Sequence, residues 1–234
     1  MRKRVLFDQF LTPHMLACSW SGGKDGCFAF WKMACAGYEI KYLLNTYRKE
    51  SGRVAFHGVR ASLIEEQARS IGVELLQKEV AGNDYEKHFL EALFELKSLG
   101  VDGIVFGDID IEQNRQWCES VCKKAGVRSY FPLWNLDQAR ILKDFIAEGF
   151  KAVVVALNSK FLNEEWLGKI IGLEFLNQIE AINVYRSATK ITPCGEMGEY
   201  HTFVFDGPLF RFPIRYRLGE KVFKEGYWLI DLLQ

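Results

Sequence analysis

The hexapeptide Ser21-Gly22-Gly23-Lys24-Asp25-Gly26 carries the clearest chemical signal of the sequence. It follows a short apolar segment at residues 15–18 and precedes a helix expected over residues 27–36. The consecutive glycines let the backbone approach a ligand closely because no Cβ intervenes. The free N–H groups at the start of the helix attract an anion, to which the lysine adds a positive charge and the serine a hydroxyl. The pattern therefore predicts a phosphate-binding loop.

The spacing differs from the G-x-x-x-x-G-K-[ST] pattern of the Walker P-loop. A tight strand-to-helix turn capped by Asp25 is the alternative interpretation of the hexapeptide. The serine before the glycines, the aspartate after them and the apolar segments on both sides favour nucleotide binding.

The composition indicates an ordinary globular protein rather than a nucleic-acid-binding one. The 234 residues are 49% hydrophobic, and 30 basic residues balance 30 acidic ones. Proteins that bind nucleic acid over a large surface usually carry a basic excess, so the zero net charge disfavours such a partner. The length is sufficient for one domain of average size and a smaller second unit.

The cysteines and the N-terminal residues indicate the cellular compartment of the protein. Six cysteines are spread without a tight framework, and a chain of this length needs no disulfide staples. No run of about eighteen apolar residues exists, so no membrane-spanning segment is expected. Asp8 and Gln9 interrupt the basic and apolar opening of the chain before it resembles a secretory signal. We expect residues 1–12 to form an N-terminal arm and the protein to be cytoplasmic.

Strand and helix signals alternate along the first two thirds of the chain. The expected strands are residues 15–18, 40–47, 74–78, 103–107, 130–134 and 152–157. The expected helices are residues 27–36, 58–71, 84–99, 112–125 and 136–148. This rhythm predicts an α/β fold with a doubly wound parallel sheet.

The alternation changes near residue 158. A helix expected over residues 174–182 precedes alternating segments at 202–205, 212–216 and 228–232. We therefore expect a nucleotide-binding domain over residues 13–158 and a smaller α+β, substrate-binding domain with antiparallel strands over residues 159–234.

Ligands of doubly wound sheets bind at the carboxyl ends of the strands, near the point where the strand order reverses. Ser19, Asn45, Gly107 and Asp108 follow expected strands and are candidates to bind the nucleotide. The Asp108 carboxylate is a candidate ligand of Mg²⁺ or of a ribose, although an aspartate at a strand end is also a common helix cap.

Together these motifs resemble the diphthine–ammonia ligase family of PP-loop ATP pyrophosphatases. The resemblance covers about residues 15–225 and rests on residues 19–25, 107–109, 115–117, 132–134, 193–202 and 206–210. It implies an adenine nucleotide α-hydrolase-like fold and the last step of diphthamide synthesis. In that step a diphthine carboxylate, on a modified histidine of a translation elongation factor, is amidated with ATP and ammonium.

The resemblance also implies roles for the loop. The triphosphate of ATP would lie on Ser21, Gly22, Gly23, Lys24 and Gly26, and Asp25 would orient the loop or hold Mg²⁺. Lys24 and Asp25 are thus expected in catalysis. The family loop usually ends in serine where this chain has Gly26, so one hydroxyl is lost and binding is expected to weaken rather than vanish.

Two further segments extend the expected site. His57 resembles a family position in the loop after the second strand, although a histidine there is as easily a surface or capping residue. Glu196, Glu199 and His201 lie within six residues, together with Tyr200. These groups could bind ammonium, deprotonate it or hold an imidazole-bearing acceptor. The alternative is a polar turn that opens the strand at residues 202–205.

Other functions remain open at this stage. The same fold could act on another carboxylate, or on tRNA through Cys118 and Cys122, which lie four residues apart on one helical face. Small buried core positions explain these cysteines more simply. A nucleotide sensor without catalysis is the non-enzymatic alternative. Because the sequence shows no glutaminase segment, free ammonium is the expected nitrogen donor, and the sequence does not indicate an oligomeric state.

Overall fold

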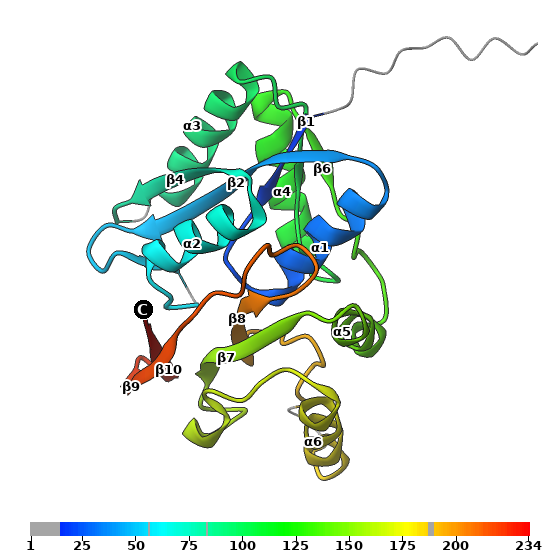
Figure 1. The fold of residues 1–234 in the computed structure, drawn as a ribbon, viewed down its shortest axis with the longest axis vertical. Coiled ribbons are helices and arrows are strands. Elements are labelled where there is room, and N and C mark those ends of the chain that lie inside the picture. The colour runs from blue at the N-terminus through cyan, green and yellow to red at the C-terminus, as the bar shows by residue number, and fades with distance from the viewer. Residues whose placement is uncertain (1–14, 56, 83, 187–189) are drawn as a thin grey trace, which may run out of the picture.

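The computed structural model describes residues 15–55, 57–82, 84–186 and 190–234. Its strands form two sheets, which lie one above the other in Figure 1 with helices around each. The arm expected over residues 1–12 lies outside the described residues. Within the described part of the chain, no helix is long and apolar enough to cross a membrane.

The first sheet has five parallel strands in the order β4-β2-β1-β5-β6, and the short β3 pairs antiparallel with the end of β2. Its strands are β1 (Met15–Ser19), β2 (Glu39–Arg48), β3 (Arg53–Val54), β4 (Glu74–Val80), β5 (Gly103–Val105) and β6 (Arg128–Tyr130). Its helices are α1 (Lys24–Cys35), α2 (Ala61–Ile71), α3 (Tyr85–Ser98) and α4 (Glu112–Ala125).

Strand β1 illustrates why both faces of this sheet are covered. Leu16 and Cys18 belong to the core that includes residues of α1 and α2, whereas Ala17 belongs to the core formed with α3 and α4. Successive side chains of a strand point to opposite faces, so an entirely apolar strand needs helices on both. The predicted doubly wound parallel sheet is confirmed.

The strand order creates a crevice at one edge of the sheet. From β1 the chain moves outward to β2 and β4, and then returns to the other side of β1 to form β5 and β6. The connections that leave β1 and β5 therefore run in opposite directions. The carboxyl ends of these two strands face the opening between the connections. This is the position at which the expected phosphate loop begins.

The second sheet is antiparallel, with the order β8-β7-β10-β9. Its strands are β7 (Lys151–Asn158), β8 (Tyr200–Asp206), β9 (Arg217–Lys224) and β10 (Tyr227–Leu233). The helices α5 (Gln138–Ala147) and α6 (Leu173–Val184) and the short 3₁₀ helix η1 (Glu164–Trp166) accompany them. The smaller antiparallel unit expected at the C-terminus is present.

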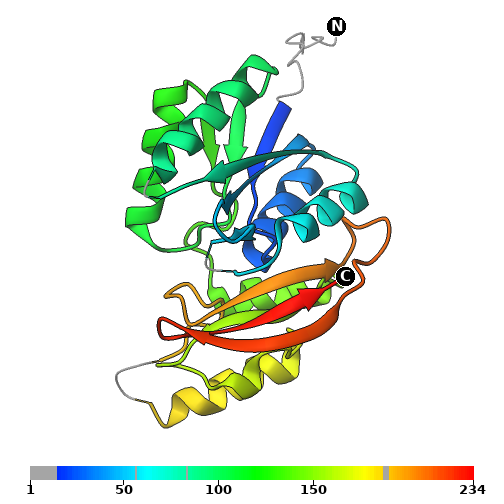
Figure 2. The same ribbon diagram turned by 90° about the vertical axis from the view of Figure 1, so that its left-hand side faces the viewer.

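Helix α1 packs against both sheets. Phe28 makes edge-to-face contacts with Phe145 and Phe150, with ring centroids 6.0 and 6.2 Å apart. One hydrophobic core thus continues from the face of the first sheet into the second, and Figure 2 shows the second sheet directly below α1 and α2. The two sheets meet beside the phosphate loop.

The placement of β7 corrects one expectation. Residues 152–157 were expected in the parallel sheet, but β7 pairs antiparallel with β8 and β10. A fully apolar strand is typical of any strand covered on both faces, and every residue from 152 to 157 is buried here. The division of the chain at residue 158 stays a prediction, and the position of β7 argues for an earlier boundary.

Three further expectations about elements were wrong. Helix α1 begins at Lys24 rather than near residue 27, because the Cys27 N–H already donates to the Gly23 carbonyl. Strand β6 ends at Tyr130, before Pro132, which has no N–H to donate to a sheet. Residues 212–216 form no strand, and β9 begins after them.

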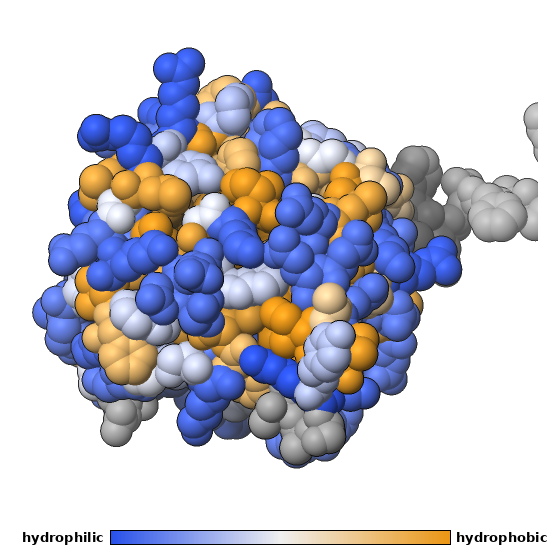
Figure 3. All heavy atoms as spheres, turned by 90° about the horizontal axis from the view of Figure 1, so that it is seen from below, coloured by the Kyte–Doolittle hydropathy of each residue, from blue (hydrophilic) through white to orange (hydrophobic). Residues whose placement is uncertain are grey.

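The surface around α6 is mixed in character. Its exposed hydrophobic residues include Leu173, Val184 and Tyr185. On the face seen in Figure 3, hydrophobic residues are interspersed with hydrophilic ones. Single exposed apolar residues of this kind are normal on globular proteins.

Candidate active site

The glycine loop connects β1 to α1 in a conformation that needs both of its first glycines. Gly22 has a φ of +84°, and a Cβ there would lie 2.6 Å from the Ile64 Cδ1 atom. A Cβ at Gly23 would lie 2.5 Å from the His57 Cε1 atom. Larger residues at either position would therefore displace neighbouring side chains, and one of these neighbours is itself a candidate site residue.

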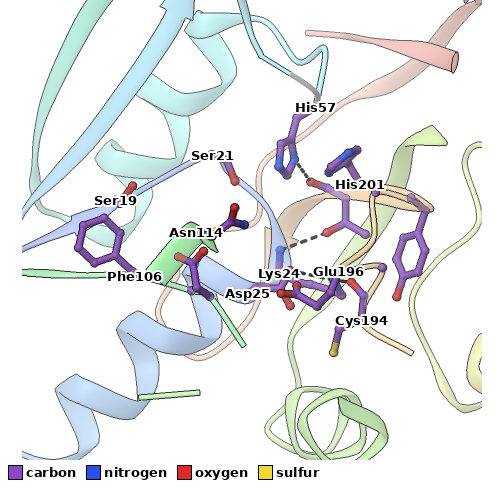
Figure 4. Close-up of a pocket in the computed structure, with 17 residues that line it drawn as sticks. Ser19, Ser21, Lys24, Asp25, His57, Phe106, Asn114, Cys194, Glu196 and His201 are labelled. Carbon is purple, nitrogen blue, oxygen red and sulfur yellow. Dashed lines mark hydrogen bonds and ion pairs between the residues drawn. The ribbon is translucent and has the colours of Figure 1, made fainter. Parts of the chain in front are cut away.

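A cavity of about 260 Å³ opens beside this loop, at the carboxyl ends of β1 and β5. Its lining includes ten residues expected from the sequence: Ser19, Ser21, Lys24, Asp25, Gly26, His57, Gly107, Asp108, Glu196 and His201. Figure 4 shows side chains from both sheets converging on this cavity. Segments separated by more than a hundred residues in sequence thus form one site.

Four expected residues do not line this cavity. Gly22 and Gly23 lie behind it, where they shape the loop backbone. Asn45 lines a neighbouring cavity instead. Glu199 is fully buried, and its Oε1 atom accepts a 2.6 Å hydrogen bond from the Thr192 N–H. Its other carboxylate oxygen has no hydrogen-bond partner among the described residues.

Lys24 is buried and its ammonium is held on two sides. It donates to the Asp25 carboxylate over 2.9 Å and to the Cys194 carbonyl, and it lies 5.0 Å from the centroid of the Tyr200 ring. Burial alone would lower the pKa of Lys24, but the Asp25 carboxylate and the other groups around it outweigh burial and raise that pKa. The positive charge is therefore fixed at the start of α1.

Two carboxylates face the same cavity. Burial raises the pKa of Asp25, although Lys24 opposes this effect, and burial together with the nearby Asp25 charge raises the pKa of Asp108. The Oδ1 atom of Asp25 is buried without a hydrogen-bond partner among the described residues. A buried carboxylate oxygen without a partner, beside a second carboxylate, can accept a cation or an oriented donor.

Glu196 reaches the cavity from the loop that precedes β8. Its backbone N–H donates to the Thr192 hydroxyl over 2.9 Å, which holds the loop closed. Burial and the negative charges of Asp25 and Asp108 raise the pKa of Glu196 to about 8. This carboxyl group can therefore exchange a proton near neutral pH.

Two histidines, one from the loop after β3 and one from β8, meet at the other side of the cavity. The ring centroids of His57 and His201 are 4.8 Å apart, and the His57 Nδ1 atom lies 2.9 Å from the Thr202 carbonyl. Burial lowers the pKa of His57 to about 4, and burial likewise holds the pKa of His201 well below its usual range. Both imidazoles are thus neutral at pH 7.

A second cavity, of about 450 Å³, adjoins the first and has a mostly apolar lining. It extends from the end of β2 to the side chains of Trp20, Tyr85 and Phe89. Ser19, Ser21, His57 and His201 line both cavities. Asn45 lines the second cavity and donates from its Nδ2 atom to the Trp20 carbonyl over 2.8 Å. An apolar cavity beside the predicted phosphate loop would suit a flat aromatic base.

Gly107 explains how tightly β5 approaches the loop. A Cβ at this position would lie 2.5 Å from the Gly26 backbone nitrogen and 2.6 Å from the Asp25 carbonyl carbon. Real side chains do not approach backbone atoms this closely, so only glycine fits. The glycine expected from its position at a strand end is thus required by the packing of α1 against β5.

Sequence reasoning gave no role to several residues that hold the site. The Thr202 hydroxyl accepts a 3.1 Å hydrogen bond from the Lys24 N–H, and Asn114 lines the first cavity. Gln67 is fully buried and bonds to the Gly22 carbonyl. A glutamine within the apolar stripe of the helix expected over residues 58–71 was the one available signal for Gln67.

Comparison with known proteins agrees with this architecture. The model of the diphthamide synthase N-terminal domain matches residues 15–129, and that of the diphthamide synthase C-terminal domain matches residues 137–233. The first match ends within β6 and the second begins just before α5, so each match covers one of the two sheets.

Relatives from several eukaryotes carry the name diphthine–ammonia ligase. The *Schizosaccharomyces pombe* protein is 29% identical over 210 residues, which cover 82% of this chain and 34% of that protein. The *Danio rerio* protein is 27% identical, with 82% of each chain covered, and the *Homo sapiens* protein is 28% identical over 78% of its length. This chain thus spans about a third of the fission yeast relative and about four fifths of the vertebrate ones. With both domain models matched in order and the phosphate loop and the residue 194–202 segment in one cavity, the chain belongs to the diphthamide synthase family.

Proposed function

We propose that this chain is an ATP-dependent diphthine–ammonia ligase, which activates a diphthine carboxylate of a translation elongation factor and amidates it with ammonium. One observation carries the proposal: the glycine loop with its buried Lys24 and the segment bearing Glu196 and His201 line the same cavity. A phosphate site and groups able to move a proton are thus available to one reaction centre.

The two adjoining cavities suit the two halves of ATP. The phosphates would lie on the loop at residues 21–26, where Lys24 and the N-terminus of α1 supply positive charge. The adenosine would extend into the apolar cavity past Ser19 and Asn45. Because Ser19 and Ser21 line both cavities, one nucleotide can occupy both without a gap.

The donor set fits Mg²⁺ that is bound largely through the nucleotide. No cluster of three or more metal-binding side chains occurs among the described residues. Magnesium commonly uses only one or two carboxylates and completes its coordination with phosphate oxygens and water. Asp25 and Asp108 would hold the ion, and its charge would help to neutralise the phosphates.

The reaction needs activation because a carboxylate has no suitable leaving group. The carboxylate oxygen attacks the α-phosphate, pyrophosphate departs, and ammonia then displaces AMP from the adenylated carboxylate. Lys24 would stabilise the departing pyrophosphate. Ammonium must lose one proton before attack and a second afterwards. The Glu196 carboxylate would accept each proton and pass it to solvent, and the neutral His201 imidazole would accept a hydrogen bond from the nitrogen.

The geometry separates the two glutamates of the C-terminal segment. Glu196 lines the cavity and would act on ammonium directly. Glu199 is buried behind the loop and accepts a hydrogen bond from the Thr192 N–H, so we propose that it holds the loop in shape. His57 lies against the glycine loop and would contact the nucleotide rather than ammonium.

The alternative of sulfur transfer to tRNA loses its chemical support. Cys118 and Cys122 belong to the core between the first sheet and α4. Burial raises the pKa of both thiols, that of Cys122 to about 12, whereas a sulfur carrier needs an accessible thiolate. The Cys118 Sγ atom lies 4.0 Å from the Asp108 Oδ2 atom and donates to it, and this negative charge further disfavours a thiolate.

The test is amidation with a diphthine-bearing elongation factor, ATP, magnesium and ammonium, with AMP, pyrophosphate and the amide measured together. Equal amounts of all three are expected from the wild type. Lys24→Ala should abolish them and weaken ATP binding measured by calorimetry. Lys32→Ala, on the same helix and outside both cavities, is the matched control. Unchanged ATP affinity in Lys24→Ala, or hydrolysis of ATP without amide, would overturn the proposal.

A further inference from the structure

Gln67 is a buried polar residue outside both cavities. It lies on α2 among apolar neighbours, including Ile64 and Ala68, and its side chain is inaccessible to solvent. Removing an amide from water is unfavourable unless its hydrogen bonds are replaced within the protein. The partners of this amide therefore indicate what it stabilises.

The Gln67 amide forms three hydrogen bonds. Its Oε1 atom accepts from the Trp20 Nε1–H over 2.7 Å. Its Nε2 atom donates to the Gly22 carbonyl over 3.1 Å and to the Val204 carbonyl over 2.6 Å. Both N–H groups and the oxygen are thus satisfied, and the indole N–H and the two carbonyls fix the orientation of the amide.

The Gly22 peptide is held from the second sheet as well. Its carbonyl also accepts a 2.9 Å hydrogen bond from the Val204 N–H of β8, and the Lys24 N–H donates to the Thr202 hydroxyl. Gly22 lies in the left-handed region with a φ of +84°, where glycine has no strong preference of its own. Its conformation therefore depends on these external bonds.

We propose that Gln67 is a positioning residue for the phosphate loop: it fixes the Gly22 peptide between α2 and β8, so that the N–H groups that follow face the nucleotide. The inference rests on the proposed function, because it assumes that residues 21–26 bind phosphates. Gln67 touches no substrate, and it acts on binding through the loop backbone.

Two substitutions remove this support in different ways. Gln67→Met keeps the length of the side chain and removes all three hydrogen bonds. Gln67→Glu keeps an acceptor for Trp20 but places a second carboxylate oxygen against the Gly22 and Val204 carbonyls. Ser70→Ala is the matched control, because Ser70 is equally buried on the same helix and its hydroxyl bonds to the Phe212 backbone rather than to the glycine loop.

The experiment measures the melting temperature, the Kd for ATP, and kcat and KM for ATP of each variant beside the wild type. All three variants are expected to melt at lower temperature. Both Gln67 variants should raise the Kd and KM for ATP about tenfold or more, whereas Ser70→Ala should stay within about twofold of the wild type. This division between stability and nucleotide binding is the result that a merely structural glutamine would not give.

The other possible results of this experiment would contradict the inference or the proposed function. Gln67 variants that melt lower but bind ATP as the wild type does would overturn the inference, and so would an equal loss of ATP binding in Ser70→Ala. If one Gln67 variant does not fold, the other is used, and loss of folding in both assigns Gln67 to the fold rather than to the loop. A wild type that binds no ATP would instead refute the proposed function, so the two failures are distinguishable.

Discussion

At the scale of single residues, Gly26 tests how much the family serine matters. Its φ lies outside the left-handed region, and a Cβ there would lie 3.3 Å from the Ser19 carbonyl oxygen. A serine therefore fits after a shift of a few tenths of an ångström and would add a hydroxyl at the phosphate loop. We expect Gly26→Ser to bind ATP within about threefold of the wild type and to amidate at least as fast. Calorimetry and initial rates check this, and a tenfold loss of affinity would show that the backbone there cannot move.

Glu196 and Glu199 are three positions apart but occupy different environments. Glu196→Gln removes the cavity carboxylate that would accept a proton from ammonium, so kcat for amidation should fall by ~10²–10⁴-fold with little change in the Kd for ATP. Glu199→Gln keeps an acceptor for the Thr192 N–H. This variant should melt at a lower temperature than the wild type, and its kcat should change much less than that of Glu196→Gln. Steady-state rates and thermal melts distinguish the two. Equal losses of kcat would place both carboxylates in the reaction.

At the scale of elements, the contact of β5 with α1 determines the shape of the loop. Gly107→Ala would place a methyl group 2.5 Å from the Gly26 nitrogen, so α1 must move away from β5. We expect at least a tenfold rise in the Kd for ATP and a lower melting temperature. Gly149→Ala is a suitable control for the added methyl group, because a Cβ there would meet no atom within 4 Å, although its φ of +87° strains an alanine and that of Gly107 does not. An alanine at residue 107 that leaves ATP affinity intact would show that this approach is unnecessary.

The loop that carries His57 is held by β10. Asp231 pairs with Arg53 over 2.8 Å and with Arg60, and Arg53 also donates to the Gly58 carbonyl. The hydrogen bond from Arg60 leads the effects that hold the pKa of Asp231 well below its usual range. An ion-pair network between the two sheets thus encloses the His57 loop.

This network predicts a pH-dependent stability. A carboxylate with a lowered pKa stabilises the fold above its unfolded pKa of about 3.9, and the contribution is lost as the pH falls toward the folded pKa. Asp231→Asn should therefore cost about 1 kcal/mol at pH 7, a modest value because the arginines are partly exposed. The difference from the wild type should shrink below about pH 4. Denaturant melts at several pH values measure it, and a constant difference would exclude the ion pairs as its cause.

The sequence was informative about elements that local patterns define. Both ends of helix α4 were predicted correctly. Its C-terminal end was recognisable because Gly126 adopts the left-handed conformation expected of a helix stop. Membership of a sheet was not predictable for β7, since a strand covered on both faces shows the same apolar run in parallel and antiparallel sheets. Ten of the expected site residues line one cavity. Those at strand ends and in the glycine loop are recognisable locally, whereas His57 was expected from the family resemblance.

At the scale of the whole molecule, the site depends on contacts that no local pattern reveals. Lys24 and Thr202 are 178 positions apart, and Gln67 and Val204 are 137 positions apart. These pairs become neighbours only when the second sheet packs below α1 and α2 (Figure 2). The second unit therefore shapes the glycine loop of the first, and under the proposed function it would also supply groups for the chemistry.

The nitrogen donor is also a question for the whole molecule. A glutamine-dependent ligase needs a nucleophilic thiolate to release ammonia. Of the described residues that line the first cavity, Cys194 is the one cysteine, and its Sγ atom is directed at the Gln138 carbonyl over 3.3 Å. Burial raises the pKa of this thiol, so it is protonated and a poor nucleophile.

We therefore expect free ammonium to support amidation and glutamine to give no product above background. Cys194→Ala should keep its ammonium-dependent kcat within a few-fold of the wild type, because the Cys194 carbonyl that holds Lys24 belongs to the backbone and survives the substitution. Amide formation measured with each donor, using enzyme freed of ammonium by gel filtration, checks both statements. Turnover with glutamine that disappears in Cys194→Ala would contradict this prediction and identify the Cys194 thiol as a glutaminase nucleophile. The assignment of the cavity would then change, because Glu196 and His201 would act on ammonia released from glutamine within the site rather than on ammonium from solution.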